Sequence, residues 1–389
     1  METWKLSEKK LEKKLGEETR TGIVIGVPSG YTSTFKGVQR FQTGVFAMTM
    51  ARKTLVDSSV TPYYHCISRC VRRAFLCGEG CEHRKQWVED RLQELAGIFA
   101  IEVCAYAVLD NHLHVVLRLN DGVAAGWSDE EVVRRWGRLF PPRGKDRKPL
   151  EVTTAWVNDR LQDAAWVASA RERLNSLGWF MKCLKEPLAR QANFEDKCKG
   201  TFWEARYKSI AILDEEALLT TLAYVDLNPL AAGMARTPET SAHTSVKARV
   251  EDCRTRGVLE EVADQPSDHT RLDQNLEDES FWLAPIEERR ERGGERAGIT
   301  SQVNLASYLR LLDWSARLLR PGKSQMPFEV AGILERLGSS ADVWRDRLER
   351  LRRRDRLYGV VFATNRASIN RLAETRGVKK LSNVTGCPD

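Results

Sequence analysis

The sequence predicts an α+β fold in which helices pack on one face of an antiparallel sheet, and three observations predict it. Short stretches rich in β-branched and aromatic residues alternate with amphipathic stretches. Their order is strand, helix, strand, strand, helix, strand, followed by one more helix, which is the ferredoxin-like plan. Hydrophobic residues make up 42% of the 389-residue chain, which is enough for a sizeable buried core.

The first half of this pattern begins at Tyr63. The stretch "YYHCISR" predicts a strand, "EHRKQWVEDRLQELAGIF" an amphipathic helix and "IEVCAYAVL" a second strand. A short turn that contains Asp110 and Asn111 leads into a third strand, "HLHVVLRL". We therefore expect a strand, a helix and two further strands before residue 120.

The second half follows a connection rich in Gly, Pro and Arg. A helical region is expected from about residue 159 to 193, with Pro187 as a kink or break. The stretch "TFWEARYKSIAIL" then predicts a strand and "DEEALLTTLAYVDLN" a helix. Asp214 is the expected N-cap of this helix, and Pro229 is expected to end it.

The sequence divides into four expected regions. Residues 1–50 predict a disordered or dispensable extension, 57–240 the α+β domain, 241–297 a charged linker and 298–389 a helical C-terminal module. Within the module, "ASINRLAETRGVKKL" is compatible with a DNA-binding helix-turn-helix and also with a simple helical hairpin.

Charge favours an anionic partner. The formal net charge is +7 and the isoelectric point about 8.9, so we expect nucleic acid, although a solvated basic surface explains the charge equally well. No apolar run reaches the roughly 20 residues that span a bilayer, and no signal-peptide core is present, so we expect a soluble cytoplasmic protein without membrane contact.

The cysteines predict free thiols. Nine is an odd number, and a disulfide framework is not expected without an export signal. Cys66, Cys70, Cys77 and Cys81 together with His83 allow a zinc site as an alternative, but their spacing differs from that of common structural zinc sites.

Two pairs of residues carry candidate chemistry. His112 and His114 alternate in a predicted strand, so both project from one face about 6–7 Å apart and can share a divalent metal. Tyr224 and Asn228 are four residues apart in a predicted helix and lie on one face of it. Satisfied histidines on a strand, and a core tyrosine near a helix-ending asparagine, are the structural alternatives.

Several separated motifs together resemble a known family. "AYAVLDNHLHVV", "GTFWEARYKS" and "YVDLNPLAAGM" occur in the order typical of the single-tyrosine HUH transposases, specifically the REP-associated tyrosine transposase branch of the insertion-sequence-200-like superfamily. The resemblance covers about residues 57–235. It implies a transposase that cuts and rejoins single-stranded or hairpin DNA. It also implies that His112, His114 and Asn228 bind Mg²⁺ or Mn²⁺ and that Tyr224 is the nucleophile.

Cations and an aromatic residue near these motifs are candidate DNA contacts: Arg69, Arg72, Arg73, Trp203, Arg206 and Lys208. Core packing is the alternative for Trp203, and a solvated surface is the alternative for the arginines. The family includes sites completed by the tyrosine of a second subunit, so a homodimer stays open. A non-catalytic nucleic-acid-binding protein that retains the fold is the rival function.

Overall fold

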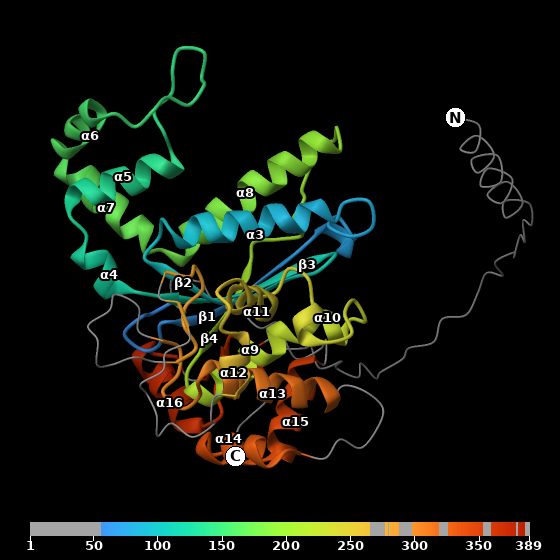
Figure 1. Cartoon of the computed structure of the whole chain (residues 1–389). Helices are drawn as coiled ribbons and strands as arrows, with labels where there is room; N and C mark the ends of the chain where they lie inside the picture. The colour runs from blue at the N-terminus through green and yellow to red at the C-terminus, as the bar shows by residue number, and fades with distance from the viewer. Residues whose placement is uncertain are drawn as a thin grey trace, which may run out of the picture. The chain divides into compact units, whose positions relative to one another are not determined.

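The structure is a computed structural model that describes residues 56–264, 277–278, 280–287, 298–318, 326–352, 359–378 and 380–385. These residues belong to one compact unit, Met50–Asp389. The expected extension over residues 1–50 lies outside the described residues. The described fold is mixed α+β and is built on a five-stranded sheet (Figure 1).

The sheet has the strand order β2-β3-β1-β4-β5. It consists of β1 (Tyr63–Arg69), β2 (Ile101–Val108), β3 (His112–Leu119), β4 (Lys208–Ile212) and β5 (Val361–Phe362). The first four strands pair antiparallel with their neighbours, whereas β5 pairs parallel with β4. The four expected strands therefore form, and β5 adds a fifth that the sequence did not predict.

Two helices cover one face of the sheet. These are α3 (His83–Ala96) and α8 (Leu177–Glu195), which run side by side above the strands in Figure 1. Leu92 and Leu95 of α3 and Phe180 of α8 share a core with side chains from alternate positions of β1 and β3, such as Cys66 and Val115. Pro187 lies inside α8, which continues as a helix through that position.

The opposite face is also covered by helices, in contrast to the one-faced packing that the sequence predicted. α9 (Glu215–Asp226) lies there, and its Leu218 and Leu222 pack against Ile67, Val116 and Ile210 of the sheet. α10 (Asn228–Ala231) follows it directly, and α11 (Ser245–Thr255), α13 (Leu305–Leu318) and α15 (Ala341–Arg352) complete this layer (Figure 1). The reason is that helix α9 is apolar on nearly all sides, so it needs partners both on the sheet and beneath it.

The connection between β3 and β4 contains more helices than expected. α4 (Asp121–Gly126), α5 (Asp129–Leu139), α6 (Thr154–Leu161) and α7 (Ala164–Leu174) precede α8. Helix α5 begins at Ser128, whose side chain accepts a hydrogen bond from the Glu131 N–H, and three acidic residues occupy its first turn. This helix lies upstream of the helical region that the sequence predicted.

The C-terminal half packs onto the same core. Region 241–297, expected to be a charged linker, contains α11 and α12 (Leu259–Asp264). Region 298–389 contains α13, α14 (Phe328–Arg336), α15, α16 (Arg366–Thr375) and also strand β5. No helix follows α16 in the described residues, where Asn383 pairs with Val361 of β5 and residues 384–385 form a turn. The described residues therefore contain no helix-turn-helix at this place.

Among the described residues, none of the helices is long and apolar enough to cross a membrane.

Candidate active site

Strand register brings three histidines together on the face that α9 covers. In the antiparallel pair of β1 and β3, Arg69 is opposite His112 and Ile67 is opposite His114. Side chains opposite one another in such a pair project from the same face. His65, two residues before Ile67, projects from that face too, and its ring centroid lies 5.1 Å from that of His114.

Helix α9 carries the tyrosine to this face. Asp214 caps the helix, since its carboxylate accepts a hydrogen bond from the Ala217 N–H at 2.8 Å, and α9 ends at Asp226, before Pro229, as the sequence predicted. The Tyr224 ring lies edge-on to the His114 ring, with 5.5 Å between centroids. Asn228 follows one turn later, and its Nδ2 atom lies 3.4 Å from the His114 Nε2 atom.

A buried carboxylate between these two residues fixes the helix. Asp226 accepts hydrogen bonds from the Tyr308 hydroxyl at 2.6 Å, from the Val246 N–H at 2.9 Å and from the Ser245 hydroxyl. Those partners lie on α13 and α11, so one side chain anchors α9 to two neighbouring helices. A buried polar group is stabilising only when its hydrogen bonds are satisfied, and here three donors satisfy it.

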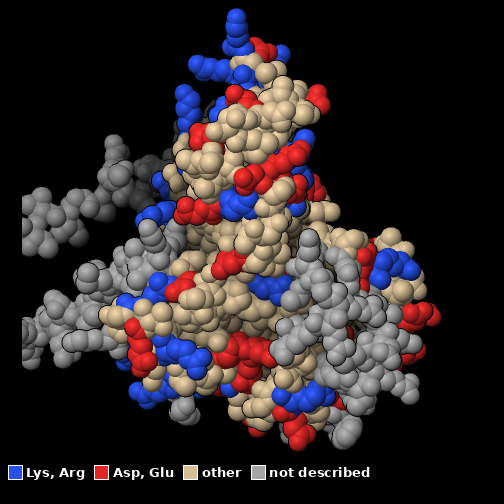
Figure 2. Space-filling view, turned by 90° about the vertical axis from the view of Figure 1, so that its left-hand side faces the viewer, with Lys and Arg blue, Asp and Glu red and all other residues tan. Residues whose placement is uncertain are grey.

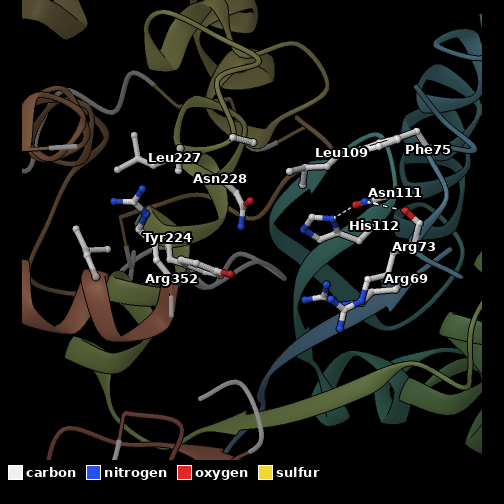
Figure 3. Close-up of a pocket in the computed structure, with 13 residues that line it drawn as sticks. Arg69, Arg73, Phe75, Leu109, Asn111, His112, Tyr224, Leu227, Asn228 and Arg352 are labelled. Atoms are coloured by element: carbon white, nitrogen blue, oxygen red, sulfur yellow. Dashed lines mark hydrogen bonds between the residues drawn. The ribbon is translucent and has the colours of Figure 1, made fainter. Parts of the chain in front are cut away.

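Hydrogen bonds orient both candidate ligand histidines in the same way. The His112 Nδ1 atom lies 2.6 Å from the Asn111 Oδ1 atom, and the Asn111 Nδ2 atom in turn donates to the Arg73 carbonyl at 3.2 Å (Figure 3). The His114 Nδ1 atom lies 2.8 Å from the His65 Nε2 atom. When each Nδ1–H donates to its partner, the lone pair of each imidazole resides on Nε2, the arrangement that metal-binding histidines use.

Burial shifts the protonation of these groups. It lowers the pKa of His65 to about 3, and together with the neighbouring histidines it lowers the pKa of His114 well below its usual range. Both rings are therefore neutral at neutral pH. Burial also raises the pKa of the Tyr224 phenol, although the hydrogen bond with Asn228 and the charges of Arg69 and Arg352 act in the opposite direction.

His112, Tyr224 and Asn228 border a cavity of about 440 Å³. In Figure 3, Tyr224 and Asn228 enter it from one side, and His112, Asn111, Arg69 and Arg73 lie on the other side. Tyr224 is 7% exposed and points its hydroxyl into the cavity (Figure 3). Five of the sequence-predicted site residues thus line one cavity, namely Arg69, Arg73, His112, Tyr224 and Asn228, and the buried His114 lies against Asn228.

The cavity is strongly cationic. Arg69, Arg73 and Arg352 line it, and no Asp or Glu does. None of these arginines forms an ion pair with a carboxylate of the described residues. By contrast, the face shown in Figure 2 carries Lys and Arg interspersed with Asp and Glu. A wall of one sign in a concave site concentrates anions such as phosphate.

The side chains of His112, His114 and Asn228 suit one divalent cation, provided that the Asn228 amide rotates to exchange its oxygen and nitrogen. In the described residues no three His, Cys, Asp or Glu side chains cluster as metal ligands, so a site here depends on the amide of Asn228 beside His112 and His114. The amide presents its nitrogen to His114, and ligation requires its oxygen there. Two imidazoles and one amide oxygen leave positions for water and phosphate oxygens.

The predicted DNA contacts separate into two groups. Arg69 and Arg73 line the cavity, and Lys208 lies opposite Ile67 on the same sheet face, where burial and Arg69 lower its pKa to about 8. Arg72 and Arg206 are exposed and lie outside the cavity lining. Both Arg72 and Arg73 adopt left-handed backbone angles, with φ of 54° and 56°, which non-glycine residues rarely adopt.

Trp203 is not placed to stack on a base. Its side chain is 8% exposed, packs on Phe202, and donates its indole N–H to the Lys185 carbonyl at 3.0 Å. In this structure Trp203 packs in the core, which was the alternative to DNA contact. The zinc alternative finds no support in the described residues either, because His83 instead pairs with Glu195 at 2.6 Å.

Sequence reasoning missed Arg352, which lines the cavity, and three residues that orient the site. These three are His65, Asn111 and Asp226, which orient His114, His112 and α9 respectively. The signal for His65 is a third histidine at an inward position of a predicted strand, and the signal for Asp226 is an acid at the end of an otherwise apolar stretch of helix. The sequence indicates Asn111 only as a turn residue.

Comparisons with known proteins yield one structural neighbour. The chain matches no protein-family model and no curated protein. A solved structure of a REP-associated tyrosine transposase bound to a REP hairpin is similar over 49% of this chain and 78% of that chain, with 12% sequence identity and a TM-score of 0.29. At that TM-score the similarity supplies no argument about function.

Proposed function

We propose that this protein is a metal-dependent single-strand DNA endonuclease and strand transferase of the HUH type, in the REP-associated tyrosine transposase branch. One observation carries the proposal. The Nδ1-anchored His112, the Asn228 amide and the Tyr224 hydroxyl line one cavity whose charged residues are all arginines, and the Nε2 atom of the buried His114 lies against Asn228. The fold is compatible with it, since the order β2-β3-β1-β4 with α3 and α8 on one face is that of a ferredoxin-like HUH domain.

Each residue has a proposed role. His112, His114 and Asn228 bind Mg²⁺ or Mn²⁺, which when bound polarises the scissile phosphate and stabilises the charge of the transition state. Arg69, Arg73 and Arg352 hold the phosphates of the strand. Asn228 also acts to lower the pKa of the Tyr224 phenol, against the effect of burial, which couples the nucleophile to the ligands.

The proposed reaction is a substitution at phosphorus. The Tyr224 hydroxyl loses its proton to solvent and forms a bond to phosphorus, while the bond from phosphorus to the 3′ oxygen breaks and that oxygen takes up a proton. The products are a 5′-phosphotyrosine link and a free 3′-hydroxyl. Attack of another 3′-hydroxyl on the link reverses the step and joins the strands without an external energy source.

We also propose that Tyr224 acts within its own chain, because it borders the same cavity as His112 of that chain. Mixing Tyr224→Phe with His112→Ala protein distinguishes the two arrangements. A site within one chain stays inactive in the mixture, whereas a site shared between two chains regains activity.

A covalent-capture assay tests the function. Labelled single-stranded or hairpin DNA is incubated with the protein and Mn²⁺ and then resolved on a denaturing gel, where we expect a shifted protein-DNA band. Tyr224→Phe removes the hydroxyl and leaves the ring, so we expect no shifted band and nearly unchanged DNA binding. If the wild-type protein binds a set of DNA hairpins and single strands but forms no adduct with any of them, the result favours a non-catalytic nucleic-acid-binding protein.

A further inference from the structure

The cavity has an apolar wall as well as a cationic one. Six apolar residues, here called the apolar wall, line it from both sides: Phe75 and Leu109 lie on the side of His112 and Leu227 on the side of Tyr224 (Figure 3), and Ala231, Ala232 and Leu348 complete the set. A phosphate group needs only the arginines, and a volume of about 440 Å³ lies in the range of cavities that hold whole small ligands. The cavity therefore has space and surface for a group larger and less polar than phosphate.

Phe75 is the unusual member of this wall. Its side chain is 67% exposed, although burying a phenylalanine is worth about 1.5–3 kcal/mol. Figure 3 shows it near Leu109 on the side of the cavity that carries Arg73 and Asn111. An exposed aromatic ring beside arginines is the composition of a surface on which a nucleobase stacks.

The loop that carries Phe75 is held in place. The Phe75 carbonyl accepts a hydrogen bond from the Gly78 N–H at 2.9 Å, and the Cys77 N–H donates to the Asp110 carbonyl at 2.8 Å. A Cβ atom at Gly78 would lie 3.0 Å from the Phe75 Cβ, so glycine permits this tight turn. The exposed ring is thus presented by an anchored backbone, which lowers the entropy cost of binding.

We propose that Phe75, with the apolar wall of the cavity, forms a nucleobase-binding subsite next to the proposed scissile-phosphate site. The inference rests on the proposed function, since it assigns the substrate's base to this wall. In a nucleotide, base and phosphate are held a few ångströms apart by the sugar. A strand whose phosphate contacts Arg69 and Arg73 therefore brings a neighbouring base to Phe75.

The subsite tolerates different bases. The amide of Asn111, which also lines the cavity, already uses its oxygen for His112 and its nitrogen for the Arg73 carbonyl. Stacking on an aromatic ring does not depend on the edge of the base. Stacking on Phe75 therefore adds affinity without selecting a particular base.

Binding of two matched oligonucleotides tests the subsite. Fluorescein-labelled dT8 and an eight-unit abasic strand of the same charge are titrated with protein in EDTA, and fluorescence anisotropy gives each Kd. For Phe75→Ala we expect about 5- to 150-fold weaker binding of dT8, as one lost stacking contact implies, and unchanged binding of the abasic strand. Phe75→Trp retains a stacking face and is expected to bind dT8 at least as well as the wild-type protein.

Phe194 provides the matched control. It is also a phenylalanine, is 86% exposed on α8, and lies outside the cavity lining. Phe194→Ala is expected to leave both dissociation constants unchanged. An equal loss of dT8 and abasic binding in Phe75→Ala, or equal losses of dT8 binding in Phe75→Ala and Phe194→Ala, would overturn the subsite.

This result is independent of the proposed chemistry. The titration contains no divalent metal and needs no adduct, so a protein that never forms a covalent adduct can still show the Phe75-dependent preference for dT8. Conversely, if Phe75→Ala forms the adduct normally and binds dT8 as tightly as the wild-type protein does, the enzyme is retained and the subsite is rejected.

Discussion

The Nε2 atom of His65 lies 2.8 Å from the Nδ1 atom of His114, so a histidine on β1 sets the orientation of a candidate metal ligand on β3. Asn111 does the same for His112 at 2.6 Å. Outer groups of this kind hold the ring of a ligand histidine and fix the nitrogen that faces the metal. The candidate site is thus larger than the motif that first indicated it.

His65→Ala is expected to raise the Mn²⁺ concentration for half-maximal adduct formation by about 10- to 100-fold, because His114 loses the partner that orients its ring. A Mn²⁺ titration of the covalent-capture assay measures this. His65→Gln, whose amide oxygen can accept the same hydrogen bond, is expected to restore part of the affinity. His83→Ala, an exposed histidine paired with Glu195, is the control. An unchanged Mn²⁺ dependence in His65→Ala would rule out the positioning role.

Substitutions of Asn228 are expected to shift Mn²⁺ dependence in opposite directions. Asn228→Asp supplies a charged oxygen and lowers the Mn²⁺ concentration needed for half-maximal adduct formation, whereas Asn228→Ala removes the ligand and raises it about tenfold or more. The same titration measures both. If the two variants shift in the same direction, Asn228 acts on Tyr224 and not on the metal.

Replacing one cavity arginine is expected to reduce the salt dependence of DNA binding. Each phosphate contact contributes about 0.7 to the slope of log Kd against log salt for a single strand. Anisotropy titrations of dT8 over a KCl series should therefore give slopes lower by about 0.7 for Arg69→Gln and for Arg352→Gln. Arg134→Gln, on the exposed surface of α5 and paired with Glu130, should keep the wild-type slope. Equal slopes in all four proteins would place the phosphates elsewhere.

Glu89 is expected to make stability depend on acid pH. Burial opposes ionisation of its carboxyl, but hydrogen bonds from His243 at 2.7 Å and from the Tyr106 hydroxyl, with the charge of Lys247, outweigh burial and lower its pKa below the usual 4.5. The unfolded chain therefore binds the proton at higher pH than the folded chain. This stabilisation is complete above pH 4.5, the pKa of the unfolded chain, and is lost as the pH falls through the lower pKa of Glu89 in the folded protein.

Urea unfolding of the wild type and Glu89→Gln measures this effect. At pH 7 the variant should be less stable by about 1.5–3 kcal/mol, the usual contribution of a hydrogen bond to a charged group, and the difference should shrink towards pH 3. A difference that stays constant with pH would mean that the carboxylate charge does not contribute.

Much of this protein was already determined by local sequence. Alternation of apolar residues located β1, β2, β3 and β4, and Asp214 and Pro229 marked the two ends of α9, because capping and proline geometry depend only on neighbouring residues. The spacing of His112 and His114 placed them on one strand face for the same reason. The order of the motifs did not predict that the pair His112 and His114 lies next to the pair Tyr224 and Asn228 in the folded protein.

Tertiary structure alone decided the rest. That α9 covers the face opposite α3, that Trp203 is buried and Phe75 exposed, and that β5 joins the sheet from a distance of some 150 residues are outcomes of packing between segments far apart in the chain. The pairing of His65 with His114 follows from strand register, which a single strand's pattern does not specify. Local spacing determined which faces the candidate residues occupy, whereas long-range burial and register decided which of those faces meet at the cavity.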